Sequence, residues 1–148
     1  MLKTMRALVL LLLVGAAIAQ GPSYTPKAYG NLKQVMRAVA LPNSDIIFAI
    51  QSKPPKTDME WQAVVNAAVA IEETSNLIMI PGRIRSNGQP VPVQAADYAK
   101  FAAALAPAGR ECMKAALVKN QDAIGNCTDT LSQACDNCHK VYRDQLQK

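Results

Sequence analysis

Two cysteines and a histidine near the end of the sequence have the spacing of a cofactor attachment site. The segment reads Cys135-Asp136-Asn137-Cys138-His139 and continues with Lys140-Val141-Tyr142-Arg143. On a helix, residues three and four positions apart share a face, so both thiols and the imidazole would project from one side. His139 is also the only histidine among the 148 residues. The pattern C-x-x-C-H is typical of covalent haem c attachment, in which the thiols bind the vinyl groups and the imidazole binds the iron.

Two other uses of these cysteines compete with haem. One is a zinc site built from all four cysteines of the chain, Cys112, Cys127, Cys135 and Cys138. Their separations do not resemble two paired knuckles, and His139 would then have no role. The other is a thioredoxin-like redox pair, which would need a preceding strand and a surrounding sheet. Nothing in the sequence reads as a sheet, so we favour haem.

The first 19 residues have the features of a cleaved secretory signal peptide. Lys3 and Arg6 precede an unbroken apolar run at 7–14, and Ala17-Ile18-Ala19 is an A-x-A cleavage signal. The alternative is an uncleaved membrane anchor, but the apolar run is short for a membrane span. The expected location is therefore the periplasm or the exterior of the cell, and the mature protein is expected to contain no membrane span.

Residues 20–148 are long enough for one domain with a single core. The whole sequence has a formal net charge of +5, and removal of Lys3 and Arg6 with the signal peptide leaves +3. No dense basic run is visible, so nucleic-acid binding is not expected. The sequence also lacks a Ser-His-Asp set, a Gly-rich phosphate loop and paired carboxylates, so we do not expect an enzyme.

The periodicity of apolar residues predicts four helices. The first begins near Ala28, is interrupted at Pro42 and restarts over 46–50, either as a kinked helix or as two helices end to end. The second begins at a capping box formed by Thr57 and Glu60. Its apolar stripe consists of Trp61, Val64, Ala68, Ile71, Ser75 and Ile78.

The last two helices follow a long loop over 83–92, in which Asn87-Gly88 predicts a turn. The third starts near Pro92 or Val93 and should bend at Pro107 and Gly109. Its apolar stripe comprises Tyr98, Phe101, Leu105, Ala108, Cys112 and Ala115. The apolar stripe of the fourth helix comprises Ile124, Cys127, Leu131, Ala134, Cys138 and Val141. The expected fold is therefore all-α, an antiparallel four-helix bundle with covalent haem near the end of the last helix.

A C-x-x-C-H motif followed by x-x-Tyr-Arg, near the C-terminus on the last of four helices, resembles the class II c-type cytochromes, the cytochrome c prime and cytochrome c-556 group. The resemblance extends over residues 27–147. It implies that Cys135 and Cys138 form thioethers with one haem c and that His139 is the proximal iron ligand. Arg143 would lie on the proximal side near a propionate, or else be a solvated helix-end arginine. Tyr142 would pack beside the haem, or else simply fill the core.

The same resemblance allows two states of the sixth coordination position of the iron. Some members of the group keep this position open, and others fill it with a methionine of the first helix. Met36 is our candidate for this distal ligand, with core filling as the alternative. The other methionines considered, Met59, Met79 and Met113, are weaker candidates. Arg37 or Arg83 could meet the propionates or could be surface charges.

These residues lead to one favoured function and two alternatives. We expect a six-coordinate carrier of one electron that docks to a redox partner protein. The alternatives are a five-coordinate haem protein that binds nitric oxide or carbon monoxide, and a haem subunit of a larger redox enzyme. The oligomeric state is open, with a homodimer through the first two helices as one alternative implied by the resemblance.

The two remaining cysteines lie at matching heights on either side of a predicted turn. The turn centres near residue 120, with Cys112 about eight residues before it and Cys127 seven after. Small neighbours, including Ala108, Ala115, Ala116 and Gly125, would allow the close approach that a disulfide needs. We therefore predict a Cys112–Cys127 bridge, the alternative being two buried free thiols.

Overall fold

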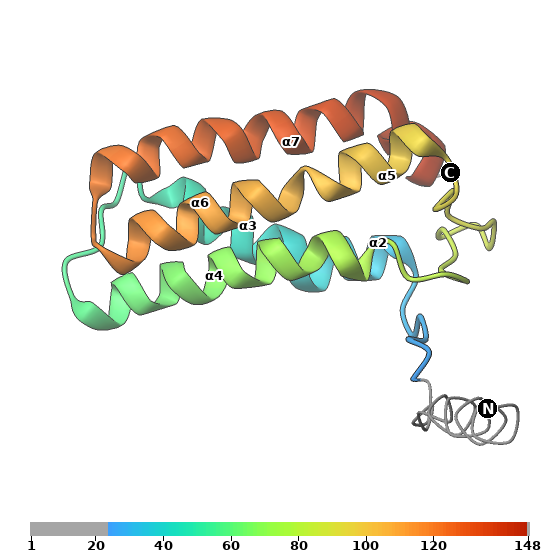
Figure 1. The fold of residues 1–148 in the computed structure, drawn as a ribbon, viewed down its shortest axis with the longest axis horizontal. Coiled ribbons are helices and arrows are strands. Elements are labelled where there is room, and N and C mark those ends of the chain that lie inside the picture. Colours follow the sequence, from blue (N-terminus) through green and yellow to red (C-terminus); the bar gives the residue numbers. More distant parts are fainter. Residues whose placement is uncertain (1–23, 148) are drawn as a thin grey trace, which may run out of the picture.

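The structure is a computed structural model that describes residues 24–147, with side chains up to residue 143. Four helical segments pack against one another, and the long helices lie side by side (Figure 1). The elements are α2 (Leu32–Val35), η1 (Met36–Ala40), α3 (Leu41–Ala49), α4 (Asp58–Leu77), α5 (Ala96–Ala103), α6 (Leu105–Leu117) and α7 (Gln121–Gln147). The described residues contain no strand, and the predicted signal peptide lies outside them. None of the described helices is long and apolar enough to cross a membrane.

The first helical segment starts later than predicted and is not interrupted at its proline. Asn31 caps α2, because its side chain accepts the Gln34 N–H and the Gln34 side chain accepts the Asn31 N–H in return. Before Pro42 the chain forms the π-helical turn η1, in which Leu41 N–H donates to the Met36 carbonyl. Because Pro42 has no N–H and its ring crowds the preceding turn, the wider π-turn lets the helix continue into α3.

Helix α4 begins where the sequence predicted. The Thr57 hydroxyl accepts the Glu60 N–H at 3.2 Å, and the Glu60 carboxylate accepts the N–H groups of Lys56 and Thr57. Every residue of the predicted apolar stripe of this helix is buried, including Trp61 at its start and Ile78 just past its end. Gly82 and Gly88 adopt positive φ in the following loop, and an isolated bridge pairs Ile84 with Pro90. The predicted turn at Asn87-Gly88 is thereby confirmed.

The third segment starts at Ala96, later than predicted, and is divided at Ala104. Pro107 accounts for the division, because a proline clashes with the carbonyl four residues earlier and leaves it without a donor. Gly109 has a different role from the predicted bend. A Cβ atom built on it would lie 2.7 Å from the Glu72 nitrogen and 2.8 Å from the Ala68 oxygen. The glycine therefore permits α6 to approach the backbone of α4.

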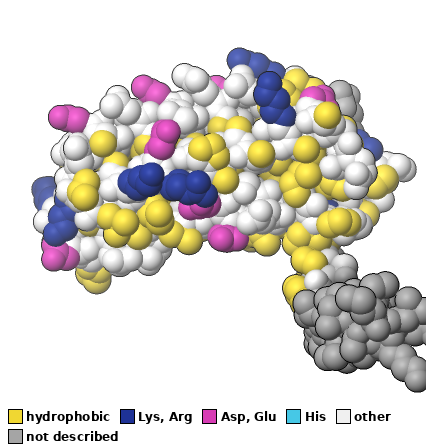
Figure 2. Space-filling model, viewed as in Figure 1, with side chains coloured by type: hydrophobic (Ala, Val, Ile, Leu, Met, Phe, Trp, Pro, Cys, Tyr) yellow, Lys and Arg dark blue, Asp and Glu magenta, His cyan; other side chains and the backbone are white. Residues whose placement is uncertain are grey.

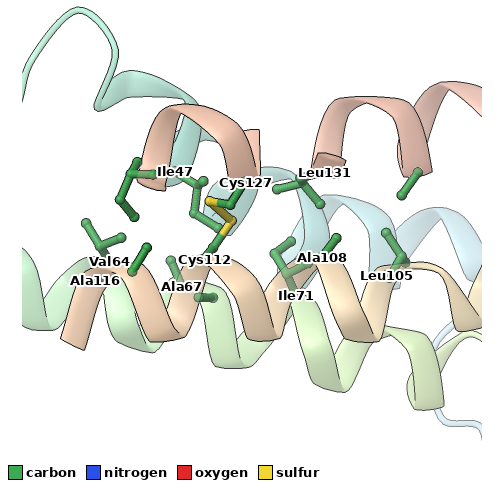
Figure 3. Close-up of a cluster of buried hydrophobic side chains, with 14 of the residues drawn as sticks. Ile47, Val64, Ala67, Ile71, Leu105, Ala108, Cys112, Ala116, Cys127 and Leu131 are labelled. Atoms are coloured by element: carbon green, nitrogen blue, oxygen red, sulfur yellow. A yellow bond between two sulfur atoms is a disulfide. The ribbon is translucent and has the colours of Figure 1, made fainter. Parts of the chain in front are cut away.

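Figure 3 shows the bridge between α6 and α7 inside the core, with Ile47, Val64 and Ala67 around it. The structure joins Cys112 and Cys127 in the disulfide that the sequence predicted, with their Cα atoms 5.2 Å apart. The turn that brings the helices together contains Lys119 at a φ of 53°, which ends α6 in the left-handed conformation. Asn120 then accepts the Ala123 N–H through its side chain and starts α7.

The predicted stripe of α7 is correct up to Cys138 and wrong at its last member. Ile124, Leu131 and Ala134 are buried, whereas Val141 is 41% exposed and Tyr142 takes the inward position. The reason is geometric: at 3.6 residues per turn, a spacing of four from Cys138 continues the inward face better than a spacing of three.

Charged side chains are dispersed over the face of the molecule seen in Figure 2. Lys and Arg side chains stand next to Asp and Glu, and apolar side chains separate the groups. Two ion pairs link elements across the surface, Arg110 with Glu72 and Lys119 with Asp58. This mixed pattern carries no concentrated basic patch on the face shown, which agrees with the absence of a basic run in the sequence.

Candidate functional site: a cavity at the C-terminal half of the last helix

A cavity of about 440 Å³ lies between the first helical segment and the C-terminal half of α7. Cavities of this size are typical of small-molecule and cofactor sites. Helices α4 and α5 contribute further walls, so all four helical segments meet here. The first segment supplies Leu32, Lys33, Met36, Arg37, Ala40, Leu41 and Ser44. The middle segments supply Ile71, Thr74 and Ile78 from α4 and its end, Tyr98 and Phe101 from α5, and Leu105 from α6. Helix α7 supplies Ala134, Cys135, Cys138, His139, Tyr142 and Arg143.

The attachment motif is on the wall that α7 contributes. Cys135 and Cys138 are free thiols, both partly buried, and His139 follows on the same face of the helix. Helix α7 has no proline or internal break over its whole length, and the bridge at Cys127 fixes it to α6. The predicted site residues Tyr142 and Arg143 line the same cavity. The structure therefore brings together all five residues that the motif predicted on this helix.

Met36 lines the cavity from the first helical segment. Among the described methionines it is the only one in the cavity lining, since Met59 is 81% exposed and Met79 and Met113 pack elsewhere against the core. Met36 is the first residue of the π-helical turn η1. Such turns are rare and occur frequently at functional sites, because the extra residue re-aims neighbouring side chains.

Charge in the cavity lining is of one sign. Lys33, Arg37 and Arg143 all line it, and no aspartate or glutamate whose side chain the structure describes does so. The rest of the lining is mainly apolar, so the cavity suits a ligand with a large apolar body and anionic groups at one edge.

Arg83, the other arginine considered for propionate binding, is not part of the lining. Its guanidinium is buried and donates to the backbone carbonyls of Leu77 and Gly30. Burial lowers the pKa of this guanidinium. Arg83 therefore fastens the end of α4 to the segment that precedes α2. The alternative of a surface charge is wrong, and Arg83 lies outside the lining of the cavity.

The environment of the two free thiols keeps them protonated. Burial raises the pKa of Cys138 to about 11, with a further contribution from Cys135. Burial also raises the pKa of Cys135, and the nearby Asp136 carboxylate acts in the same direction. Redox-active cysteine pairs have lowered thiol pKa values, and the shifts at Cys135 and Cys138 run in the opposite direction.

The zinc alternative loses two of its four ligands, because Cys112 and Cys127 are bonded to each other. Among the side chains that the structure describes, residues 24–143, no group of three or more His, Cys, Asp or Glu is placed to hold a metal ion. A site made only from cysteines is therefore not available in this structure.

The surroundings of His139 favour its neutral imidazole form. Burial lowers its pKa, and the cationic Arg143 one helical turn later acts in the same direction, against the weaker influence of Asp136. A neutral ring keeps a nitrogen lone pair free, and this is the form in which histidine binds metals.

Three aromatic side chains line the cavity, and the sequence assigned only one of them, Tyr142, to the site. Tyr142 packs edge-to-face on Tyr98, with ring centroids 5.2 Å apart, and on Phe101 at 6.2 Å. Tyr98 and Phe101 were predicted only as core stripe of the third helix. Aromatic residues that line a cavity and aromatic residues that fill a core have the same spacing along a helix. Only the position of Tyr98 and Phe101 relative to Tyr142 on α7 could have shown which role they have. Lys33 was also missed, although its spacing from Arg37 places both on one helix face.

Comparison of the chain with protein family models, with curated proteins and with solved structures found no match. The function is therefore inferred from the residues that line the cavity.

Proposed function

We propose that the protein is an exported single-haem c-type cytochrome that carries one electron, similar to the class II group. The observation that supports this most strongly is that one cavity is lined by the two free thiols, by the only histidine of the chain and by a methionine from another helical segment. We further propose that the four helical segments form an antiparallel bundle and that the mature protein is periplasmic or secreted, as the sequence pattern predicts.

The lining fits haem c chemically. Haem has an apolar macrocycle and two carboxylates, and the cavity combines apolar walls with Lys33, Arg37 and Arg143. Cys135 and Cys138 would hold the macrocycle through thioethers, which form when each S–H bond adds across a vinyl C=C bond. His139 would bind the iron. The bound group would supply a one-electron couple between ferric and ferrous iron.

Met36, which lines the same cavity as His139, would be the second protein ligand of the iron. A thioether with an imidazole stabilises ferrous iron and gives low-spin iron, which suits electron transfer because the ligand set does not change. The protein would then act as a carrier for a redox partner protein and not as a catalyst. If Met36 does not bind iron, the open position would favour the alternative function, reversible binding of nitric oxide or carbon monoxide.

Visible spectra of the oxidised and reduced protein test this function. Our proposal predicts low-spin spectra in both states, cycling with one electron per haem, and no carbon monoxide adduct. A high-spin spectrum at neutral pH with rapid carbon monoxide binding would contradict the carrier function and support the gas-binding alternative.

A further inference from the structure

The wall that the first helical segment contributes to the cavity repeats every four residues. Leu32, Met36, Ala40 and Ser44 all line the cavity, and each is four positions after the one before it. Successive residues of a uniform α-helix are about 100° apart, so every step of four overshoots a full turn by about 40°. Over the whole row, from Leu32 to Ser44, the overshoot would reach about 120°. A uniform helix would therefore turn one end of this row away from the cavity.

The π-helical turn η1 removes most of this drift. It lies in the middle of the row, and in it the Leu41 N–H donates to the carbonyl of Met36, five residues earlier. Such a turn contains one residue more than an α-helical turn, which sets the helix back by about 100°. The net drift from Leu32 to Ser44 is then only about 20°, so both halves of the row face the same cavity.

Pro42 excludes the α-helical alternative to this turn. It has no N–H to donate to the Ala38 carbonyl, and its ring would clash with that carbonyl in an α-helix. The neighbouring Asn43 side chain donates to the Val39 carbonyl inside the turn at 2.7 Å. The ring of Pro42 is exposed and is not part of the cavity lining. Any effect of Pro42 on the cavity must therefore pass through the backbone.

We propose that Pro42 is a positioning residue, which keeps Met36 on the same cavity wall as Ser44 by excluding the α-helical turn. Lys33 and Arg37, the two cations of this wall, depend on the same turn. An α-helical turn at this point would rotate Met36 and both cations by about 100° relative to α3, which would take them out of the cavity. The consequence for iron ligation rests on the proposed function, whereas the register of the cavity wall does not.

The test compares the purified full protein with Pro42→Ala and Pro42→Ser, which restore a backbone N–H at an exposed position. Nuclear magnetic resonance detects a backbone hydrogen bond as a scalar coupling between the amide nitrogen and the carbonyl carbon. The samples are reduced, and carbon monoxide is added wherever the iron is high-spin. In the wild type we expect a coupling between the Leu41 nitrogen and the Met36 carbonyl. In both variants this coupling should be lost and replaced by one from Leu41 to the Arg37 carbonyl, its α-helical partner.

The visible spectrum of the same samples is the second readout. Both proline variants should lose most of the low-spin signal and bind carbon monoxide, because Met36 would no longer face the iron. The matched control is Pro107→Ala, since Pro107 is also an exposed proline within a helix and lies outside the cavity lining. The control should leave the Leu41–Met36 coupling and the spectrum unchanged.

Deletion of one residue separates the register of the helix from any other effect of losing the proline. Ala38 is exposed and lies inside η1. Pro42→Ala combined with deletion of Ala38 should form a continuous α-helix that is one residue shorter, so the set-back of about 100° is kept. This variant should regain the low-spin spectrum that Pro42→Ala loses.

The two single proline variants decide the proposal without the deletion. Persistence of the Leu41–Met36 coupling in both would overturn the positioning role, as would a low-spin spectrum that survives the loss of this coupling. A protein that carries no haem, but in which the coupling moves from Met36 to Arg37 in both variants, would support the register and contradict only the proposed function.

Discussion

Met36 and His139 line one cavity although they belong to the first and last helical segments of the chain. The π-helical turn that begins at Met36 and the unbroken helix that carries His139 both contribute to this arrangement. A thioether sulfur and an imidazole nitrogen in the same cavity form the ligand pair expected for a low-spin electron-transfer haem. The choice between an electron carrier and a gas-binding protein therefore depends on one side chain, Met36.

Replacing Met36 by alanine should convert the haem from low-spin to high-spin and open the iron to carbon monoxide. The reduction potential should fall, because the thioether favours ferrous iron. Met113→Ala is the matched control, since Met113 is a partly buried methionine outside the cavity lining. Absorption spectroscopy with and without carbon monoxide gives the answer, and an unchanged low-spin spectrum in Met36→Ala would rule out this ligand.

Removing the disulfide should destabilise the protein by about 3 kcal/mol, the value expected for a closed loop of this length. The two bridged cysteines are 15 residues apart in the sequence. The variant is Cys112→Ser/Cys127→Ser, which leaves no unpaired thiol at this position, and urea denaturation gives the free energy of unfolding. Thiol labelling of the denatured, non-reduced wild-type protein is the accompanying control. Two labelled thiols in addition to any at Cys135 and Cys138 would show that the bridge does not form.

Two glycines inside helices should respond to alanine in opposite directions. Gly109→Ala places a Cβ atom against the backbone of α4, which cannot yield without separating the helices, so we expect a loss of about 1–3 kcal/mol. Gly125→Ala meets no atom within 4 Å and should stabilise α7 by about 0.5–1 kcal/mol. Chemical denaturation of both variants measures the pair. Equal effects would mean that α4 and α6 are not packed as closely as described.

Stability should decline in acid partly through the capping box of α4. Backbone hydrogen bonds from Lys56 and Thr57 lower the pKa of Glu60 below its ordinary value of 4.5. A lowered pKa means that the contribution is complete above the ordinary value and is lost as the pH falls through the folded-state value. Glu60→Gln should therefore weaken the pH dependence of the melting temperature below about pH 4.5. Glu111→Gln, at an exposed position within α6, is the control that should leave the acid slope as in the wild type.

The sequence predicted most of the fold because its strongest signals are local. The Thr57–Glu60 capping box and the 3,4 spacing of apolar residues on α4 depend only on nearby residues, and the structure confirms both. The missed features depend on packing between segments. The break at Ala104 follows from Pro107, but no local signal shows that Gly109 faces α4. The start of α2 after Asn31 could have been predicted, since Asn31 and Gln34 have the spacing of a capping box.

The candidate site was predictable where residues are close together in the sequence and less so across helices. Cys135, Cys138 and His139 are fixed by their own spacing, and Met36 follows from its place on an apolar face. Burial of Arg83 could not be foreseen, because it depends on how a loop meets distant elements.

The central claim is tested most directly by the mass of the mature protein after expression in a host that exports and matures c-type cytochromes. We predict the polypeptide mass plus one haem, retained after extraction with acidified acetone. Cys135→Ser and Cys138→Ser should each weaken retention, and the double variant should abolish it. A protein whose haem is fully extracted, or one that carries no haem and has both thiols free, would contradict the assignment.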